Sequence, residues 1–82
     1  MDLKTTTHDL IDQIGAGMSA EFLADLHVTA EAGEFRIALE MLCEQCFEFD
    51  RIADAVAFEK LSGIAPVIGL GADFLKWVQS NS

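Results

Sequence analysis

The chain has 82 residues, of which 51% are hydrophobic, and its 14 acidic against 5 basic residues give a formal net charge of −9. This length fits one domain spanning residues 1–82, and the hydrophobic content argues against a disordered chain. The charge disfavours binding to nucleic acid or to anionic membranes, so a basic protein is the favoured kind of partner.

The N-terminal segment has no features of a signal peptide, because residues 1–10 contain neither a basic stretch nor an apolar core. The longest apolar run, residues 64–72, includes a proline and two glycines and is too short to span a bilayer. We therefore expect a cytoplasmic protein whose two cysteines are buried thiols.

Apolar residues recur with helical spacing along most of the chain, and no segment shows sustained alternation. We expect an all-α fold, a compact bundle of four to five short helices. The first helix is expected from about His8 to Gly15, with Thr7 as its N-cap. Its apolar stripe consists of Leu10, Ile11 and Ile14.

The second helix is expected to begin after Ser19, a good N-cap, and to end before Gly33. Its buried face comprises Phe22, Leu23, Leu26 and Ala30. The third helix, about Glu34 to Asp50, carries the widest apolar stripe and is expected to be central. Its inner residues are Phe35, Ala38, Leu39, Leu42, Cys43, Cys46 and Phe49, with Ile37 and Met41 at the side.

A fourth helix is expected from Arg51 to Leu61, because Gly63 and Pro66 are typical helix breakers. Its inward residues would be Ile52, Val56 and Leu61, and Pro66 would open a short turn over residues 67–70. The last helix, about residues 72–79, is expected to bury Phe74, Leu75 and Val78, with Trp77 at the rim.

The third helix carries an acidic stripe. Glu40, Glu44 and Glu48 are spaced i, i+4, i+8, so their carboxylates lie on one face, where each like-charge pair costs a few tenths of a kcal/mol. Within the helix only Arg36 can offset this repulsion, and Phe47 lies beside the stripe. The pattern indicates either a solvated helix face or a surface that recognises a basic protein.

No motif predicts catalysis. Cys43 and Cys46 form a CxxC pair, but the pair lies in the middle of a helix on its apolar stripe, so core packing is the favoured interpretation. A zinc site needs two further ligands, and we expect His8 and His27 to be isolated from each other and from the cysteines. His27 is interpreted as a histidine at the edge of an apolar helix face. We therefore expect a protein that is not an enzyme and has no cofactor or metal.

Residues 33–50 have the sequence GEFRIALEMLCEQCFEFD. With this pattern the segment resembles the central part of MafI-type bacterial immunity proteins, relatives of those that serve contact-dependent growth inhibition systems. That family often shows Gly-Glu, then Ala-Leu-Glu, Leu-Cys and aromatic-Glu-aromatic-Asp at this spacing. The corresponding residues here are Gly33-Glu34, Ala38-Leu39-Glu40, Leu42-Cys43 and Phe47-Glu48-Phe49-Asp50. The aromatic residues are Phe where Tyr is common in the family.

This resemblance implies a small cytoplasmic helical protein that binds one cognate toxin C-terminal domain, frequently a nuclease, in a one-to-one complex. It implies no catalysis and no cofactor. With the acidic stripe, it leads us to expect that a basic toxin domain binds the third helix and its C-terminal edge. The expected contact residues are Glu40, Glu44, Phe47, Glu48, Asp50 and Asp54.

Two alternatives belong to other classes. An acyl carrier domain is similarly small, acidic and helical, but it needs a serine at the start of a helix, typically in Asp-Ser-Leu; neither Ser19 nor Ser62 matches. A small regulator could instead form a homodimer, weak or stable, through an apolar C-terminal patch. That patch would consist of Ile68, Leu70, Phe74 and Trp77.

Overall fold

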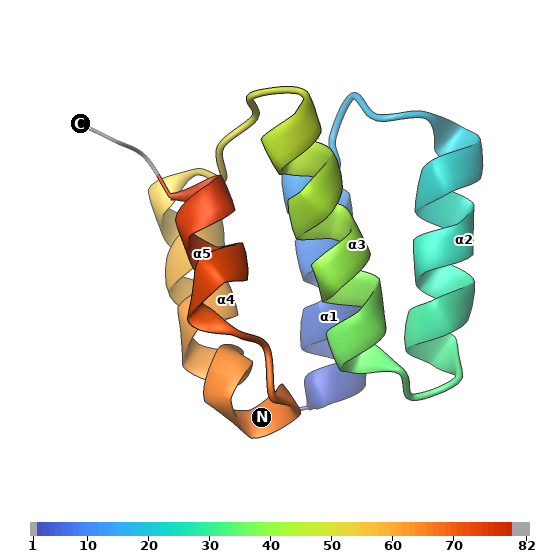
Figure 1. Cartoon of the computed structure of the whole chain (residues 1–82). Helices are drawn as coiled ribbons and strands as arrows, with labels where there is room; N and C mark the ends of the chain where they lie inside the picture. Colours follow the sequence, from blue (N-terminus) through green and yellow to red (C-terminus); the bar gives the residue numbers. More distant parts are fainter. Residues whose placement is uncertain (1, 80–82) are drawn as a thin grey trace.

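The computed structural model describes residues 2–79, which form five helices and no strand. The helices are α1 (Leu3–Ile14), α2 (Ala20–Glu31), α3 (Phe35–Glu48), α4 (Ala55–Ile68) and α5 (Ala72–Val78). Successive helices run in opposite directions, so the loops alternate between the two ends of the molecule (Figure 1). The expectation of a compact all-α bundle is confirmed.

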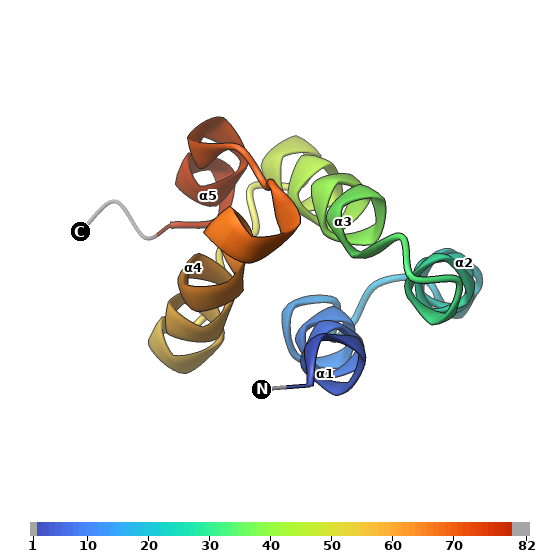
Figure 2. The ribbon, with the colours of Figure 1, turned by 90° about the horizontal axis from the view of Figure 1, so that it is seen from below.

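α3 is the central helix, as expected from its apolar stripe. It packs against all four of the others, whereas α2 packs only against α1 and α3 within the described chain. The view along the bundle shows α2 at one edge and α5 and α4 at the other (Figure 2). The core side chains of α3 are Ala38, Leu39, Leu42, Cys43 and Cys46.

α1 begins earlier than predicted. Asp2 is its N-cap, with a carboxylate that accepts hydrogen bonds from the backbone N–H groups of Lys4, at 3.0 Å, and Thr5, at 3.4 Å. The expectation that Thr7 caps the helix is wrong, because Thr7 lies inside the helix and is fully buried. Three consecutive threonines have modest helix propensity, which is why the sequence pattern placed the start too late.

α2 begins where expected, since the Ser19 hydroxyl accepts a hydrogen bond from the N–H of Phe22 at 3.1 Å. It ends at Glu31 with Ala32 as its C-cap, and Gly33 follows with a φ of +86°, the left-handed conformation that closes many helices. The N–H of Gly33 bonds to the carbonyl of Ala30, and that of Glu34 to the carbonyl of Thr29. This tight turn delivers the chain directly to the first turn of α3.

The prediction for the fourth helix is wrong in both boundaries. Residues 51–54 form a loop, and α4 runs through Gly63 and Pro66 to Ile68, with Gly69 as its C-cap at a φ of +78°. Pro66 lies in the last turn of α4, where it has no N–H to donate to the carbonyl four residues earlier. Burial of Ala57, Leu61, Ile64 and Ala65 along one stripe stabilises the helix across both residues.

The shift in α4 changes which side chains are exposed. Ile52 and Val56 were expected to point inward, but they are 57% and 63% exposed. Phe49 was expected on the inner stripe of α3 and is 62% exposed, because it is the C-cap, where the helix has ended. Leu70, expected in an exposed patch, is buried instead. Val78 is buried and Trp77 lies partly exposed at the rim, as predicted.

Candidate partner-binding surface

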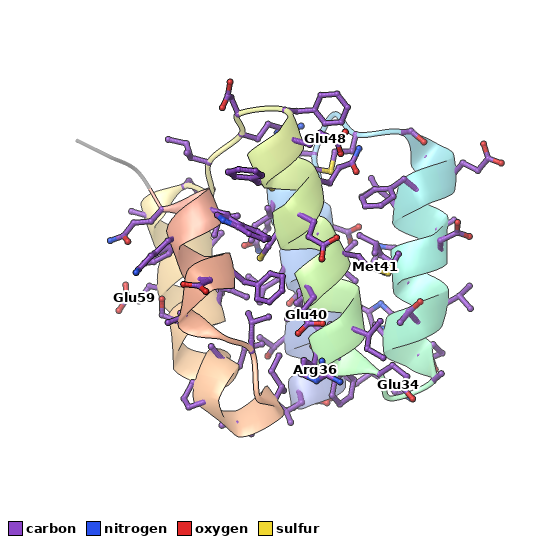
Figure 3. All side chains as sticks on the ribbon, in the orientation of Figure 1. Glu34, Arg36, Glu40, Met41, Glu48 and Glu59 are labelled. Atoms are coloured by element: carbon purple, nitrogen blue, oxygen red, sulfur yellow. The ribbon has the colours of Figure 1, made fainter. Side chains whose placement is uncertain are left out.

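The acidic stripe runs along α3, and Figure 3 labels Glu40 in the lower half of this helix and Glu48 at its upper, C-terminal end. Each glutamate of the stripe is rotated by about 40° around the helix axis from the previous one, and Glu48 lies about 12 Å along the axis from Glu40. Glu40 is therefore closer to the core, with its side chain 23% exposed, whereas Glu44 and Glu48 are exposed.

Arg36 neutralises one end of the stripe, as predicted. Its guanidinium donates to both carboxylate oxygens of Glu40, at 3.0 and 3.1 Å. Glu44, Glu48 and Asp50 make no salt bridge within residues 2–79. The negative charge that is available to a partner is therefore concentrated at the C-terminal end of α3.

Phe47 provides an exposed aromatic surface beside these carboxylates. Its side chain is 59% exposed, and one side of the ring packs on Trp77 of α5, with ring centres 4.9 Å apart. Trp77 in turn meets the edge of Phe74. Trp77 thus covers one side of the Phe47 ring, while most of the surface of Phe47 remains in contact with water.

Asp50 is held by the turn that ends α3. Its φ of +54° is left-handed, and it is the one residue other than glycine with a positive φ in the described chain. The N–H of Arg51 bonds to the carbonyl of Cys46 at 2.8 Å, and that of Asp50 to the carbonyl of Phe47 at 3.4 Å. These bonds form a Schellman motif, in which glycine usually occupies the position of Asp50.

Asp54, the last of the expected contact residues, has a structural role. Its carboxylate accepts a hydrogen bond from the N–H of Ala57 at 2.8 Å and so caps α4. Asp54 is still exposed, but one of its carboxylate oxygens is occupied by the hydrogen bond that caps α4. The connection between α3 and α4 is further tied to α5 by a bond from the N–H of Ala53 to the carbonyl of Val78, 2.9 Å.

Sequence reasoning missed the apolar part of this region. Phe49, Ile52 and Val56 are exposed along the connection from α3 to α4 and the first turn of α4. The usable signal was Asp54, because an acidic N-cap there predicts a helix that starts at residue 55 and an exposed segment before it. We use the name acidic–aromatic surface for Glu44, Phe47, Glu48, Asp50 and Ile52; Phe49 lies apart from it, in a hollow that it lines with Met18 and Phe22.

A hollow of about 360 Å³ adjoins this surface between the end of α3 and α5. Phe47, Ile52 and Trp77 supply its apolar lining, and Arg51 and Lys76 bring two basic side chains to it. The acidic–aromatic surface therefore borders a mixed pocket, into which a side chain of a partner could insert.

The two cysteines are buried and reduced, in agreement with the expected core packing. Burial, with smaller contributions from Cys46 and from the carboxylates of α3, raises the pKa of Cys43 to about 12. Burial also raises the pKa of Cys46. In residues 2–79, no group of three or more His, Cys, Asp or Glu side chains is arranged to hold a metal ion.

The expectation that His8 and His27 are isolated from each other is wrong. Their Nδ1 atoms lie 2.6 Å apart between α1 and α2. The antiparallel pairing of these two helices brings together residues 19 positions apart, which periodicity within each helix cannot reveal. Hydrogen bonds from Lys4 and then from His8 lower the pKa of Glu31, at the end of α2.

None of the helices described is both long and apolar enough to cross a membrane. No protein family model, no curated protein and no solved structure matches this chain. The geometry of the acidic–aromatic surface is therefore the main structural basis for a functional proposal.

Proposed function

We propose that this chain is an immunity protein that binds a basic toxin domain through the acidic–aromatic surface. The observation that carries the proposal is the exposure of Phe47 and Ile52 among carboxylates that make no salt bridge within the described chain. The resemblance of residues 33–50 to MafI-type immunity proteins supplies the class of partner. A nuclease domain is the kind of toxin that such proteins frequently neutralise.

The chemistry of the surface supports binding rather than stability of the isolated chain. Exposed apolar side chains gain free energy when a partner covers them, and aromatic anchors dominate many interfaces. Carboxylates around them attract a basic partner over long distances and accelerate association. Glu44 and Glu48 repel each other in the free protein, and this repulsion is relieved when lysine or arginine side chains approach.

The backbone at Asp50 offers independent support. In a Schellman motif the left-handed position is most stable as glycine, and an aspartate there costs free energy. Retaining a carboxylate at this point places a negative charge at the edge of the acidic–aromatic surface. The turn also fixes the backbone at Asp50, so that little backbone entropy is lost there when a partner binds.

The first test is calorimetric binding of the purified protein to the toxin domain encoded next to it, at two salt concentrations. A one-to-one complex of nanomolar or tighter affinity that weakens with added salt supports the proposal. Absence of binding at both concentrations contradicts it. A solution mass of twice 8.9 kDa together with no toxin binding would favour a homodimeric regulator instead.

The second test locates the surface. The E44K/E48K variant reverses two charges on α3, and E21K/D25K reverses two exposed carboxylates with the same spacing on α2, so both variants have the same net charge. We expect association with the toxin domain to slow about ten- to a hundredfold in the first variant and much less in the second. Equal effects of the two variants would remove α3 from the interface.

A further inference from the structure

The rings of His8 and His27 meet edge to edge. Their planes differ by 12°, their centres are 4.9 Å apart and their Nδ1 atoms are 2.6 Å apart. The nitrogens are closer than the centres by about two ring radii, so both Nδ1 atoms lie between the centres, on the line that joins them. The rings are therefore nearly coplanar, and the two Nδ1 atoms point directly at each other.

The outer nitrogens determine the protonation of this pair. Nε2 of His8 lies 3.1 Å from a carboxylate oxygen of Glu31, and Nε2 of His27 lies 2.8 Å from a carboxylate oxygen of Asp12. An ionised carboxylate only accepts hydrogen bonds, so each Nε2 must carry a proton and donate it. In a neutral imidazole the other nitrogen, Nδ1, then has a lone pair and no proton.

Two facing lone pairs at 2.6 Å repel each other, and two facing N–H groups cannot approach that closely. The distance fits a single proton between the nitrogens, donated by one ring and accepted by the other. We propose that His8 and His27 share one proton and act as a pH-dependent clasp that holds α2 against α1. The clasp is closed with one Nδ1 proton and opens when that proton is lost or when a second is added.

The charges around the pair are compatible with one shared positive charge. Asp12 and Glu31 each bond to one ring, and Lys4 bonds to Glu31 at 3.1 Å. No charged side chain of α3 or α4 bonds to either histidine within the described chain. The His8 and His27 side chains are 25% and 30% exposed, so protons can exchange with solvent.

The clasp lies at the edge of the bundle. α2 packs only against α1 and α3 in residues 2–79, and its fully buried side chains are Leu26 and Ala30. The histidine pair adds a polar contact between α1 and α2 to the packing of the partly buried Phe22 and Leu23. Opening of the clasp is expected to loosen α2 before the rest of the bundle.

The sign of the pH dependence follows from proton counts. In acid each of the two histidines of the unfolded chain binds one extra proton, so the unfolded chain carries two extra protons and the folded clasp carries one. Stability therefore rises with pH. In base the folded clasp carries one and the unfolded chain none, so stability falls with pH. The contribution of the pair therefore has a maximum at an intermediate pH, where the folded clasp and the unfolded chain bind the same number of protons.

The test compares the wild-type chain with H8Q, H27Q and the double variant. Glutamine can keep a donor near the position of Nε2 but has no equivalent of Nδ1. The unfolding equilibrium constant is measured by denaturant titration from pH 4.5 to 9. We expect the unfolding equilibrium constant of each variant, divided by that of the wild type, to reach a maximum of about fivefold at an intermediate pH. This is the effect of losing one hydrogen bond, and the ratio should fall at lower and at higher pH.

A monotonic or flat ratio would overturn the proposal, because it would mean that the histidines titrate independently. Nitrogen-15 NMR of the wild-type histidine rings provides a second readout that does not require any variant to fold. We expect protonated Nε2 on both rings and one proton shared by the two Nδ1 atoms at the pH of maximum stability. Separate protons on both Nδ1 atoms, or an unprotonated Nε2, would exclude the clasp.

Discussion

Phe47 of α3 packs on the indole of Trp77 of α5, with ring centres 4.9 Å apart and planes tilted by 31°. This contact links the helix that carries the acidic stripe to the last helix of the bundle. It also orients an exposed aromatic ring toward solvent at the edge of a 360 Å³ hollow. The same side chain thus contributes to packing and to the proposed interface.

The first prediction separates these two contributions of Phe47. The F47A variant loses both the aromatic pair and part of the partly buried ring, so we expect unfolding to require about 1–2 kcal/mol less free energy. We also expect toxin binding to weaken at least tenfold. The control is V28A, which truncates a 70% exposed apolar side chain on α2 and should leave affinity unchanged. Equal affinities of F47A and wild type would remove Phe47 from the interface.

The second prediction concerns the left-handed residue Asp50. The D50G variant relieves the positive φ and should stabilise the fold by about 0.5–1 kcal/mol. Toxin binding should nevertheless weaken, because a carboxylate is lost. The D50N variant keeps a side chain that tolerates this conformation, so it should lose affinity without gaining as much stability. Denaturant unfolding and calorimetry measure the two effects; unchanged affinity in both variants would exclude the charge of Asp50 from binding.

The third prediction follows from the pKa of Cys43, which burial raises from 9.0 to about 12. Because only the thiolate reacts with alkylating agents, the native C46A variant should react with iodoacetamide at least tenfold more slowly than the unfolded chain at pH 8. Between pH 9 and 12 the folded state keeps a proton that the unfolded state loses, so stability should fall as pH rises. The decline should be shallower in C43A, and an equal slope would contradict this account.

The fourth prediction concerns the buried hydroxyl of Thr7, which has no hydrogen-bond partner within the described chain. Its burial costs free energy because the bond to water is not replaced. Replacing it with a methyl group in T7V should stabilise the fold by about 1 kcal/mol, measured by denaturant unfolding. The T7S variant keeps the hydroxyl and removes the methyl group, so it should destabilise; a loss of stability in T7V would show that the hydroxyl is satisfied in solution.

The fifth prediction compares two glycines. Gly63 lies in the middle of α4 with open space where a methyl group would be, so G63A should stabilise by about 0.5–1 kcal/mol. A methyl group at Gly15 would collide with the carbonyl of Ile11 and the side chain of Leu23, so G15A should destabilise. Thermal unfolding of the two variants provides the measurement, and a stabilised G15A would contradict the close packing of α1 on α2.

Much of the fold could be predicted from local patterns. The helical spacing of Leu39, Leu42 and Cys46 identified the central helix, and Ser19 identified the start of α2. The Arg36–Glu40 pair also followed from spacing, because residues four apart on a helix are neighbours. These features depend on residues within one or two turns of each other, so a single sequence contains the information.

Predictions that depended on a balance of forces were less accurate. Gly63 and Pro66 are poor helix formers, but the buried stripe around Leu61 and Ile64 outweighs their local cost, and α4 continues. Ile52 and Val56 were placed on the wrong side because the start of this helix was assigned four residues too early. The sequence could indicate only the charges of the candidate surface; its apolar part emerged from the exposure of the residues that follow α3.

The sequence by itself determined an all-helical chain, its strong negative charge and the acidic row on its central helix, because these depend on composition and on short-range periodicity. Tertiary structure decided the contact between His8 and His27, the support of Phe47 by Trp77 and the exposure of residues 49–56. Each of these arises between segments that are distant in sequence or at a helix boundary, where packing of the whole bundle outweighs local propensity.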